Sequence, residues 1–553
     1  MMLKPNKIPE IPILTKQVAH ASFPKGNIYI TLKDELGIIY ENEFFADLFP
    51  AKGQPAADPW RLAMITVMQF IEGLSDRQAV EAMASRIDWK YLLSLELTAT
   101  GYDNSVLCEF RSRLIKGAPV TLLLDRLLKK CEERKWIKKR GTIRTDSTHM
   151  LGAIRATNRL VCIGETIRAA LNSLATVAPD WMRQHAIPDW TKRYSSRIGS
   201  TRLPQSQLKQ LGFAIQIGKD GYDLLDIIYQ QDDEGWLRNL PAVKLLRNVW
   251  VQQFYLQEDK INYRDKQLGI PPALQFISSP YDKDARYAKK YTTSWIGYKV
   301  HITETCQEDL PYLITHMVTT KSPIADSNMT DGIHDDLKKD KRLPKTHLVD
   351  TGYIDSALLV NSKKQYAVEL LGPTRSDQKW QARSGKGFAL KNFKVDLDKQ
   401  EAICPEGHTS KSWTIAYDKR KKEMIKVKFS MKDCKVCKSK AFCTKAQRRT
   451  LTLLPKEEYQ AMIKARIGQS RGDYITTYNR RAGVEATISL GVRAFGMRRS
   501  RYIGLCKANL QNVIIATAMN FSRIYYWLEE RPRERTRISA FRKLMEYPDR
   551  IVA

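Results

Sequence analysis

The sequence predicts an α/β protein that carries large helical additions, and three observations predict it. Residues 346–350 have the composition of a buried strand, residues 356–364 that of a helix, and residues 367–371 that of a second strand. A strand, a crossover helix and a second strand form the basic unit of an α/β core. Helical patterns dominate residues 53–135 and 455–530, and four cysteines crowd into the polar segment 376–450.

Size and charge limit the classes of function. The chain has 553 residues, 43% of them hydrophobic, so it can form several domains and is too apolar to be disordered. It has 91 Lys and Arg against 60 Asp and Glu, a net charge of +31. This surplus favours a polyanionic partner, with nucleic acid first and an acidic membrane surface second. No apolar run approaches the roughly 20 residues that span a bilayer, and the start lacks the features of a signal peptide, so we expect a cytoplasmic protein without a membrane partner.

The N-terminal quarter is predicted to be an irregular arm over residues 1–52, with β-like runs at 27–32 and 37–40, followed by a helical domain over 53–135. The helical domain has a helix start at Asp58-Pro59, a stop at Gly73, a capping box from Ser75 to Gln78, and later helices at 105–114 and 119–136. Such short helices are compatible with a helix-turn-helix-like DNA-binding unit. A bundle that merely packs on the rest of the chain is the alternative.

The α/β core is predicted in three parts, separated by a helical insertion and a cysteine-rich insertion. The first part follows a basic patch at 138–140 and contains a strand at 141–146 that ends on Asp146; the second contains strands at 295–303 and 312–319 and the strand that ends on Asp350. The predicted boundaries are 136–160, 281–375 and 455–530 for the core, 161–280 for the mostly helical insertion, 376–454 for the cysteine-rich insertion, and 531–553 for a charged tail.

Three acids are candidates for metal chemistry. Asp146 and Asp350 are placed at strand ends, where carboxylates can hold Mg²⁺ beside phosphate oxygens. Tyr478, Arg481 and Glu485 are spaced to share one helix face, which offers a third acid. Two Asp and one Glu in a basic protein suit two-metal phosphoryl chemistry. The alternatives are a strand-terminal Asp that only caps a turn, and a Glu485 that only pairs with Arg481.

These residues resemble the motifs of bacterial insertion-sequence transposases of the DDE type. Tyr478, Arg481 and Glu485 match the Tyr-x2-Arg-x3-Glu signature of one large group within that family. Residues 349–353 (Val-Asp-Thr-Gly-Tyr) resemble the motif of the second Asp, and residues 145–148 (Thr-Asp-Ser-Thr) that of the first. Residues 297–301 resemble the strand between the two, and residues 73–77 and 110–114 the helical N-terminal domain.

The resemblance implies a ribonuclease-H-like catalytic core in which Asp146, Asp350 and Glu485 bind two Mg²⁺ ions, with Mn²⁺ as a substitute. It further implies a homodimer or larger complex that binds the inverted repeats at the element's ends, cuts the DNA and transfers the 3′ ends to a target. Tyr478 and Arg481 would hold phosphates near the cut. A catalytically inactive DNA-binding regulator and a nuclease on the same core are the alternatives. His149 and His347 lie near the acids in sequence, but we expect ordinary strand histidines.

One position departs from the family pattern. The signature usually continues to a Lys seven residues after the Glu, and that position is Val492 here. The nearest cation is Arg493, and Arg498 and Arg499 follow it. These three arginines are candidates for phosphate contacts, with an ordinary solvated face as the alternative.

The cysteine cluster suggests structural zinc. Four thiolates satisfy tetrahedral zinc, and the candidate ligands are Cys404, Cys434, Cys437 and Cys443. His408 competes for the fourth position, and a cluster of unliganded cysteines is the alternative. Several related transposases carry a similar insert, which favours zinc.

Overall fold

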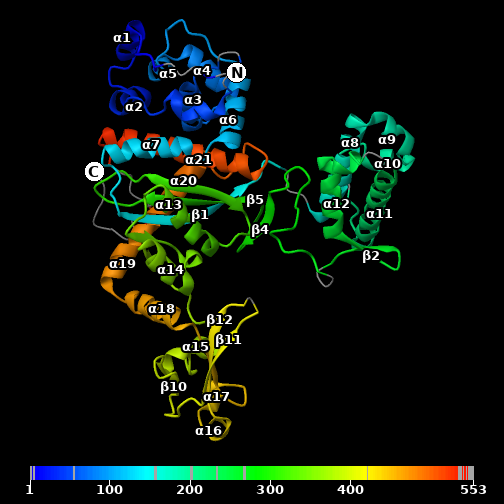
Figure 1. Ribbon diagram of the computed structural model, residues 1–553, viewed down its shortest axis with the longest axis vertical. Coiled ribbons are helices and arrows are strands. Elements are labelled where there is room, and N and C mark those ends of the chain that lie inside the picture. Colours follow the sequence, from blue (N-terminus) through cyan, green and yellow to red (C-terminus); the bar gives the residue numbers. More distant parts are fainter. Residues whose placement is uncertain are drawn as a thin grey trace.

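The computed structural model describes residues 3, 7–50, 52–53, 56–154, 158–199, 203–231, 235–265, 269–419, 421–532, 539, 541–542 and 545. A mixed α/β core occupies the centre, with helices α1–α7 above it in the view of Figure 1, a separate helical insertion to one side, and the cysteine-rich segment below. The expected mixed α/β architecture is confirmed. Most of the predicted tail, 531–553, lies outside the described residues.

The central sheet has six strands in the order β4-β5-β1-β7-β8, with β6 also paired to β5. Strands β4, β1 and β6 run antiparallel to β5, whereas β1, β7 and β8 run parallel to one another. The strands are β1 (Thr142–Leu151), β4 (Arg286–Lys290), β5 (Thr293–Thr305), β6 (Ile314–Lys321), β7 (Thr346–Leu348) and β8 (Glu369–Leu371).

The sequence prediction placed Asp146 at the end of a strand, and this is wrong. Strand β1 continues five residues further, because β5 is long enough to pair with it up to Leu151, opposite Gly297. Asp146 therefore lies in the middle of β1, opposite Ile302. The other strand ends before its acid, since β7 stops at Leu348 and Asp350 begins the 3-10 turn η5 (Thr351–Tyr353).

One face of the sheet packs on helix α21 (Leu505–Leu528), which lies between the sheet and the N-terminal helices. Asn520 receives a hydrogen bond from the backbone of Ile314 in β6. Apolar side chains of β5, β6, α21 and the N-terminal helices form one continuous core. The N-terminal elements are α1 (Ile13–Ser22), α2 (Ile28–Leu36), η1 (Asn42–Leu48), α3 (Pro59–Glu72), α4 (Asp76–Ser85), α5 (Ile87–Leu92), α6 (Ser105–Gly117) and α7 (Leu122–Glu133).

Local signals in the N-terminal part were predicted well except at the start. Gly73 ends α3 with a left-handed φ of 72°, and Ser75 and Gln78 form the capping box of α4. The β-like interpretation of residues 27–32 is wrong, because Asn27 caps helix α2 by accepting from the backbone N–H groups of Tyr29 and Ile30. Within α2 the buried residues Tyr29, Ile30, Leu32 and Leu36 recur at helical spacing.

The opposite face of the sheet packs on α13 (Thr330–Lys339) and α14 (Ser356–Tyr366), through apolar residues that include Ile333, Val349 and Leu358. The 3-10 turn η4 (Asp326–Met329) leads into α13. Helices α18 (Lys456–Gly468) and α19 (Gly472–Asn479), the 3-10 turn η7 (Arg480–Ala482) and helix α20 (Gly483–Ala494) return the chain to β1.

The helical insertion has an apolar core of its own. By length and composition alone, α8 is apolar enough to cross a membrane, although the sequence suggested no such run. Its residues Ile163, Ile167 and Leu174 are fully buried in this core, as in the central helix of a bundle. The elements are α8 (Arg159–Val177), α9 (Pro179–His185), α10 (Pro188–Tyr194), α11 (Gln207–Gln231), η3 (Leu237–Asn239), α12 (Pro241–Gln253), β2 (Phe254–Gln257) and β3 (Lys260–Tyr263).

The cysteine-rich segment forms a small module of short strands around Phe393, Val427 and Leu451. Its elements are α15 (Trp380–Arg383), η6 (Leu390–Asn392), β9 (Lys394–Asp396), β10 (Glu401–Ile403), β11 (Ser412–Tyr417), β12 (Glu423–Lys428), α16 (Met431–Val436), α17 (Lys440–Cys443) and β13 (Thr450–Leu453).

Candidate functional site

The parallel pairing of β1 with β7 brings the first two acids together. Arg144 of β1 lies opposite Leu348 of β7. Asp146 and Asp350 each follow two residues later, so they lie side by side at the same height of the sheet. Burial is the main cause that raises the pKa of Asp146, and the negative charge of Asp350 adds to it, as expected for neighbouring carboxylates.

Arg481 joins the third acid to the first. Its guanidinium lies 2.7 Å from Asp146 Oδ2 and 3.2 Å from Glu485 Oε1. Arg481 is in η7 and Glu485 is in the first turn of α20, so the single helix that the sequence predicted is interrupted by a 3-10 turn. The Nε of Arg481 is buried and has no hydrogen-bond partner among the described residues.

The environment of Asp146 disfavours its charged form. Burial raises the pKa of Asp146 to about 6, while the charge of Arg481 and the N–H of Ser147 act in the opposite direction. Burial also raises the pKa of Tyr478, and the charges of Asp350, Asp146 and Glu485 add to this effect. Tyr478 stacks on Tyr474 with ring centroids 5.6 Å apart. The residues of the predicted signature therefore lie around the acids.

A further acid, Asp326, lies beside Asp350 and was not singled out from the sequence. A Cβ added to Gly352 would lie 3.0 Å from both Asp326 Oδ2 and Asp350 Oδ1. These two carboxylate oxygens are therefore within about 6 Å of each other. Asp326 accepts hydrogen bonds from Lys299 of β5 and Ser147 of β1. No local pattern in the sequence indicates it, because its partners lie 27 and 179 residues away along the chain.

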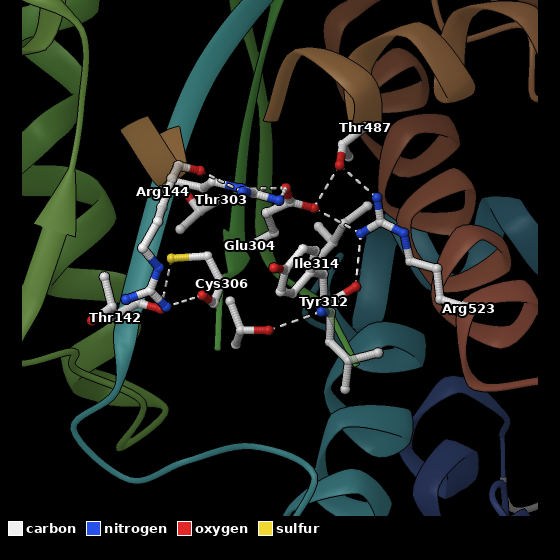
Figure 2. Close-up of polar contacts among 12 residues, drawn as sticks. Thr142, Arg144, Thr303, Glu304, Cys306, Tyr312, Ile314, Thr487 and Arg523 are labelled. Atoms are coloured by element: carbon white, nitrogen blue, oxygen red, sulfur yellow. Dashed lines mark hydrogen bonds and ion pairs between the residues drawn. The ribbon is translucent and has the colours of Figure 1, made fainter. Parts of the chain in front are cut away.

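A buried charge network holds α20 against the sheet (Figure 2). Glu304 of β5 is 0% exposed and lies 2.7 Å from the guanidinium groups of both Arg144 and Arg523. Thr487 of α20 donates a hydrogen bond to Glu304. Burial opposes the ionisation of Glu304, but the two arginines and Thr487 outweigh it and lower its pKa.

The same network limits side-chain size at the start of α20. A Cβ on Gly483 would lie 2.1 Å from Arg144, so only glycine fits there without a shift. Arg144 also donates to the backbone oxygen of Arg480 in η7. Arg144 and Thr487 thus each lie two residues from a predicted catalytic acid, Asp146 and Glu485. Residues 300–305 of β5 are all buried, so no alternation along the strand singles out Glu304 in the sequence.

The remaining candidates of the sequence analysis lie near the site but contact it less directly. Arg498 donates to Thr148 Oγ1 in β1 at 3.1 Å, and Arg499 pairs with Leu151 at the end of β1. Arg493 is exposed and contacts only its own helix in the interactions resolved for it. His347 is fully buried and bonds to Thr145 Oγ1, as expected of a strand histidine.

The four cysteines converge in the small module. Cys404 follows β10, Cys434 and Cys437 lie in and just after α16, and Cys443 ends α17. Burial raises the pKa of Cys443 to about 11, and the other three thiols contribute in the same direction. The exposed His408 ring lies 3.9 Å from Asp433. In the described part of the chain, no three His, Cys, Asp or Glu side chains are arranged to hold a metal ion as they stand.

Comparisons with known proteins identify two parts of the chain. A family model described as Transposase DDE domain matches residues 403–525, which include Glu485 and most of α21. A model described as Transposase domain (DUF772) matches residues 17–113, within the N-terminal helices. No curated protein matches the chain. Both models describe transposase domains, and together they indicate an insertion-sequence DDE transposase.

Proposed function

We propose that this protein cuts the ends of its insertion sequence at the inverted repeats and transfers them to a target, with Asp146, Asp350 and Glu485 as the catalytic acids of a ribonuclease-H-like core. The observation that carries the proposal is the convergence of these side chains from three segments separated by two long insertions. We further propose that it acts as a dimer or larger complex on DNA in the bacterial cytoplasm.

The acids fit divalent metal ions by their chemistry. Carboxylate oxygens are the ligands that Mg²⁺ prefers, and Mn²⁺ accepts the same donors. The raised pKa of Asp146 reflects a negative charge that burial and Asp350 leave poorly compensated. Asp146, Asp350 and Glu485 would hold two such ions, which supply an activated water and neutralise charge at the scissile phosphate.

Arg481 and Tyr478 act on the DNA in this proposal. Arg481 bridges Asp146 and Glu485, and its Nε has no hydrogen-bond partner within the described part of the chain. We propose that it releases the carboxylates and binds a phosphate beside the cut through its planar fork. The Tyr478 hydroxyl, kept protonated by its raised pKa, donates to the same phosphate. Arg493, Arg498 and Arg499 extend the contact along the backbone.

Two further parts have proposed roles. The N-terminal helices bind the repeats, although their shared core with α21 also fits the alternative of a bundle that packs on the rest. The four cysteines hold a structural zinc, because their thiols converge and soft thiolates suit that ion.

A cleavage assay tests the proposal. The protein is incubated with Mg²⁺ and DNA that carries the inverted repeats flanking its gene. Asp350→Asn should abolish cleavage and leave DNA binding nearly unchanged. Asp355→Asn is the matched control: Asp355 caps α14 five residues away, and Asn caps a helix equally well. Binding without cleavage by the wild-type protein would favour a regulator, and cutting that ignores the ends would favour a nuclease.

A further inference from the structure

The hairpin of β4 and β5 projects beyond the rest of the central sheet. The first five residues of β5 pair with β4, whereas β1 pairs with β5 only from Gly297 onward. Trp295 anchors the hairpin, since it is buried and its Nε1 donates to Ser322 Oγ. Residues 289–294, the tip, are all exposed. In Figure 1, β4 and β5 lie at the side of the core that is nearer the helical insertion.

The tip is basic and carries an exposed aromatic ring. Its sequence is Lys-Lys-Tyr-Thr-Thr-Ser, without an acid. Lys290 pairs with Thr293, so Tyr291 lies in a two-residue turn. Tyr291 is 88% exposed and has a left-handed φ of 54°. Gly, Asn or Asp would fit such a turn with less strain, so a tyrosine here is not explained by the fold.

The charge of Lys290 in the tip acts on Asp146 and lowers its pKa, against the larger raising effect of burial. Leu151, at the end of β1, pairs with Gly297 of the hairpin strand and also with Arg499. The hairpin and residues 498–499 therefore flank the end of β1, which lies five residues after Asp146. Burial lowers the pKa of His149, and the positive charges of Arg498 and Lys290 lower it further.

We propose that this tip holds the DNA strand next to the scissile phosphate, with Lys289 and Lys290 on backbone phosphates and Tyr291 stacked on a base. The inference rests on the proposed function and names a contact within it. A two-stranded ribbon fits a DNA groove, and an aromatic ring stacks on any base that leaves the helical stack at a nick. The basic tip complements the charge of the DNA backbone.

The first test measures salt dependence without cleavage. Binding of the terminal-repeat duplex, nicked at the cut, is measured without added Mg²⁺ or Mn²⁺ over a range of salt concentrations. Lys289→Ala/Lys290→Ala should reduce the slope of log K against log salt by about 1.8, since each phosphate contact contributes about 0.9. The control is Lys419→Ala/Lys421→Ala, in the turn between β11 and β12 of the cysteine-rich module. An unchanged slope, or an equal loss in the control, would overturn the proposal.

The second test measures whether a base beside the nick stacks on Tyr291. A 2-aminopurine beside the nick should lose fluorescence when wild-type protein or Tyr291→Phe binds, and keep it with Tyr291→Ala. Tyr417 is the matched control, because it is 65% exposed at the end of β11, and Tyr417→Ala should behave as wild type. Equal quenching by Tyr291→Ala would refute the stacking contact. Failure of the wild-type protein to bind the duplex would instead count against the proposed function itself.

Discussion

Glu304→Gln is expected to lower the free energy of unfolding of the core by about 3–5 kcal/mol, because it leaves two arginines without a counter-charge in the interior. Glu304 is 0% exposed, and the side chains of Arg144 and Arg523 are 4% and 16% exposed. Gln has nearly the volume of Glu, so the loss contains no cavity contribution. Urea unfolding followed by circular dichroism measures it.

The variant should also impair catalysis beyond its effect on stability. Arg144 and Thr487 connect Glu304 to positions two residues from Asp146 and Glu485, so a looser network displaces these acids relative to each other. We expect slower end cleavage at a temperature where the variant is folded, with unchanged DNA affinity. Arg523→Met should cost less stability in the Glu304→Gln background than in the wild type, because its partner is already lost.

A matched control separates the two effects. Asp220 of the helical insertion is buried and paired with Arg193 at 2.7 Å, so Asp220→Asn also removes a buried counter-charge. It should destabilise the insertion and leave the cleavage rate unchanged. A stability loss below about 1 kcal/mol for Glu304→Gln, or equal cleavage defects in both variants, would refute the reasoning.

Three further predictions concern the site and the cysteine module. Because the pKa of Asp146 is raised to about 6, this carboxyl is protonated at low pH. Calorimetry should therefore show divalent cations binding about tenfold more weakly at pH 5 than at pH 7. The Asp146→Asn variant should lose this pH dependence. Gly483→Ala should cost about 1–3 kcal/mol in urea unfolding, since its Cβ would meet Arg144, whereas Gly472→Ala, with open space around it, should cost nothing. Cys434→Ser should abolish zinc retention in metal analysis of the purified protein; less than about one zinc per chain in the wild type would contradict the zinc proposal.

Local chemistry explains what the sequence could predict. The capping box at Ser75, the helix stop at Gly73 and the helix at 356–364 depend on neighbouring residues, and each is confirmed. The end of β1 depends instead on its partner: β5 pairs with it up to Leu151, which no local signal in β1 indicates. Helix α2 was missed because β-branched and aromatic residues favour strands locally, while burial against other helices decides the outcome.

The residues of the candidate site also fall into those that the sequence could predict and those that it could not. Asp146, Asp350, Arg481 and Glu485 could be singled out because they resemble family motifs, and the structure brings them together. Asp326 and Glu304 could not be found by spacing, because they contact segments far away in the chain: Ser147 is 179 residues from Asp326, and Arg144 is 160 residues from Glu304.

The position of α21 has a consequence for synthesis of the protein. The N-terminal helices are made first, but the helix that fills the space between them and the sheet begins only at Leu505. Until it leaves the ribosome, the apolar faces of α3 and β6 have no cover, and such surfaces favour aggregation. Nascent chains should therefore depend on chaperones for most of their elongation. Fragments that end before residue 505 should be insoluble even though they contain the whole N-terminal domain.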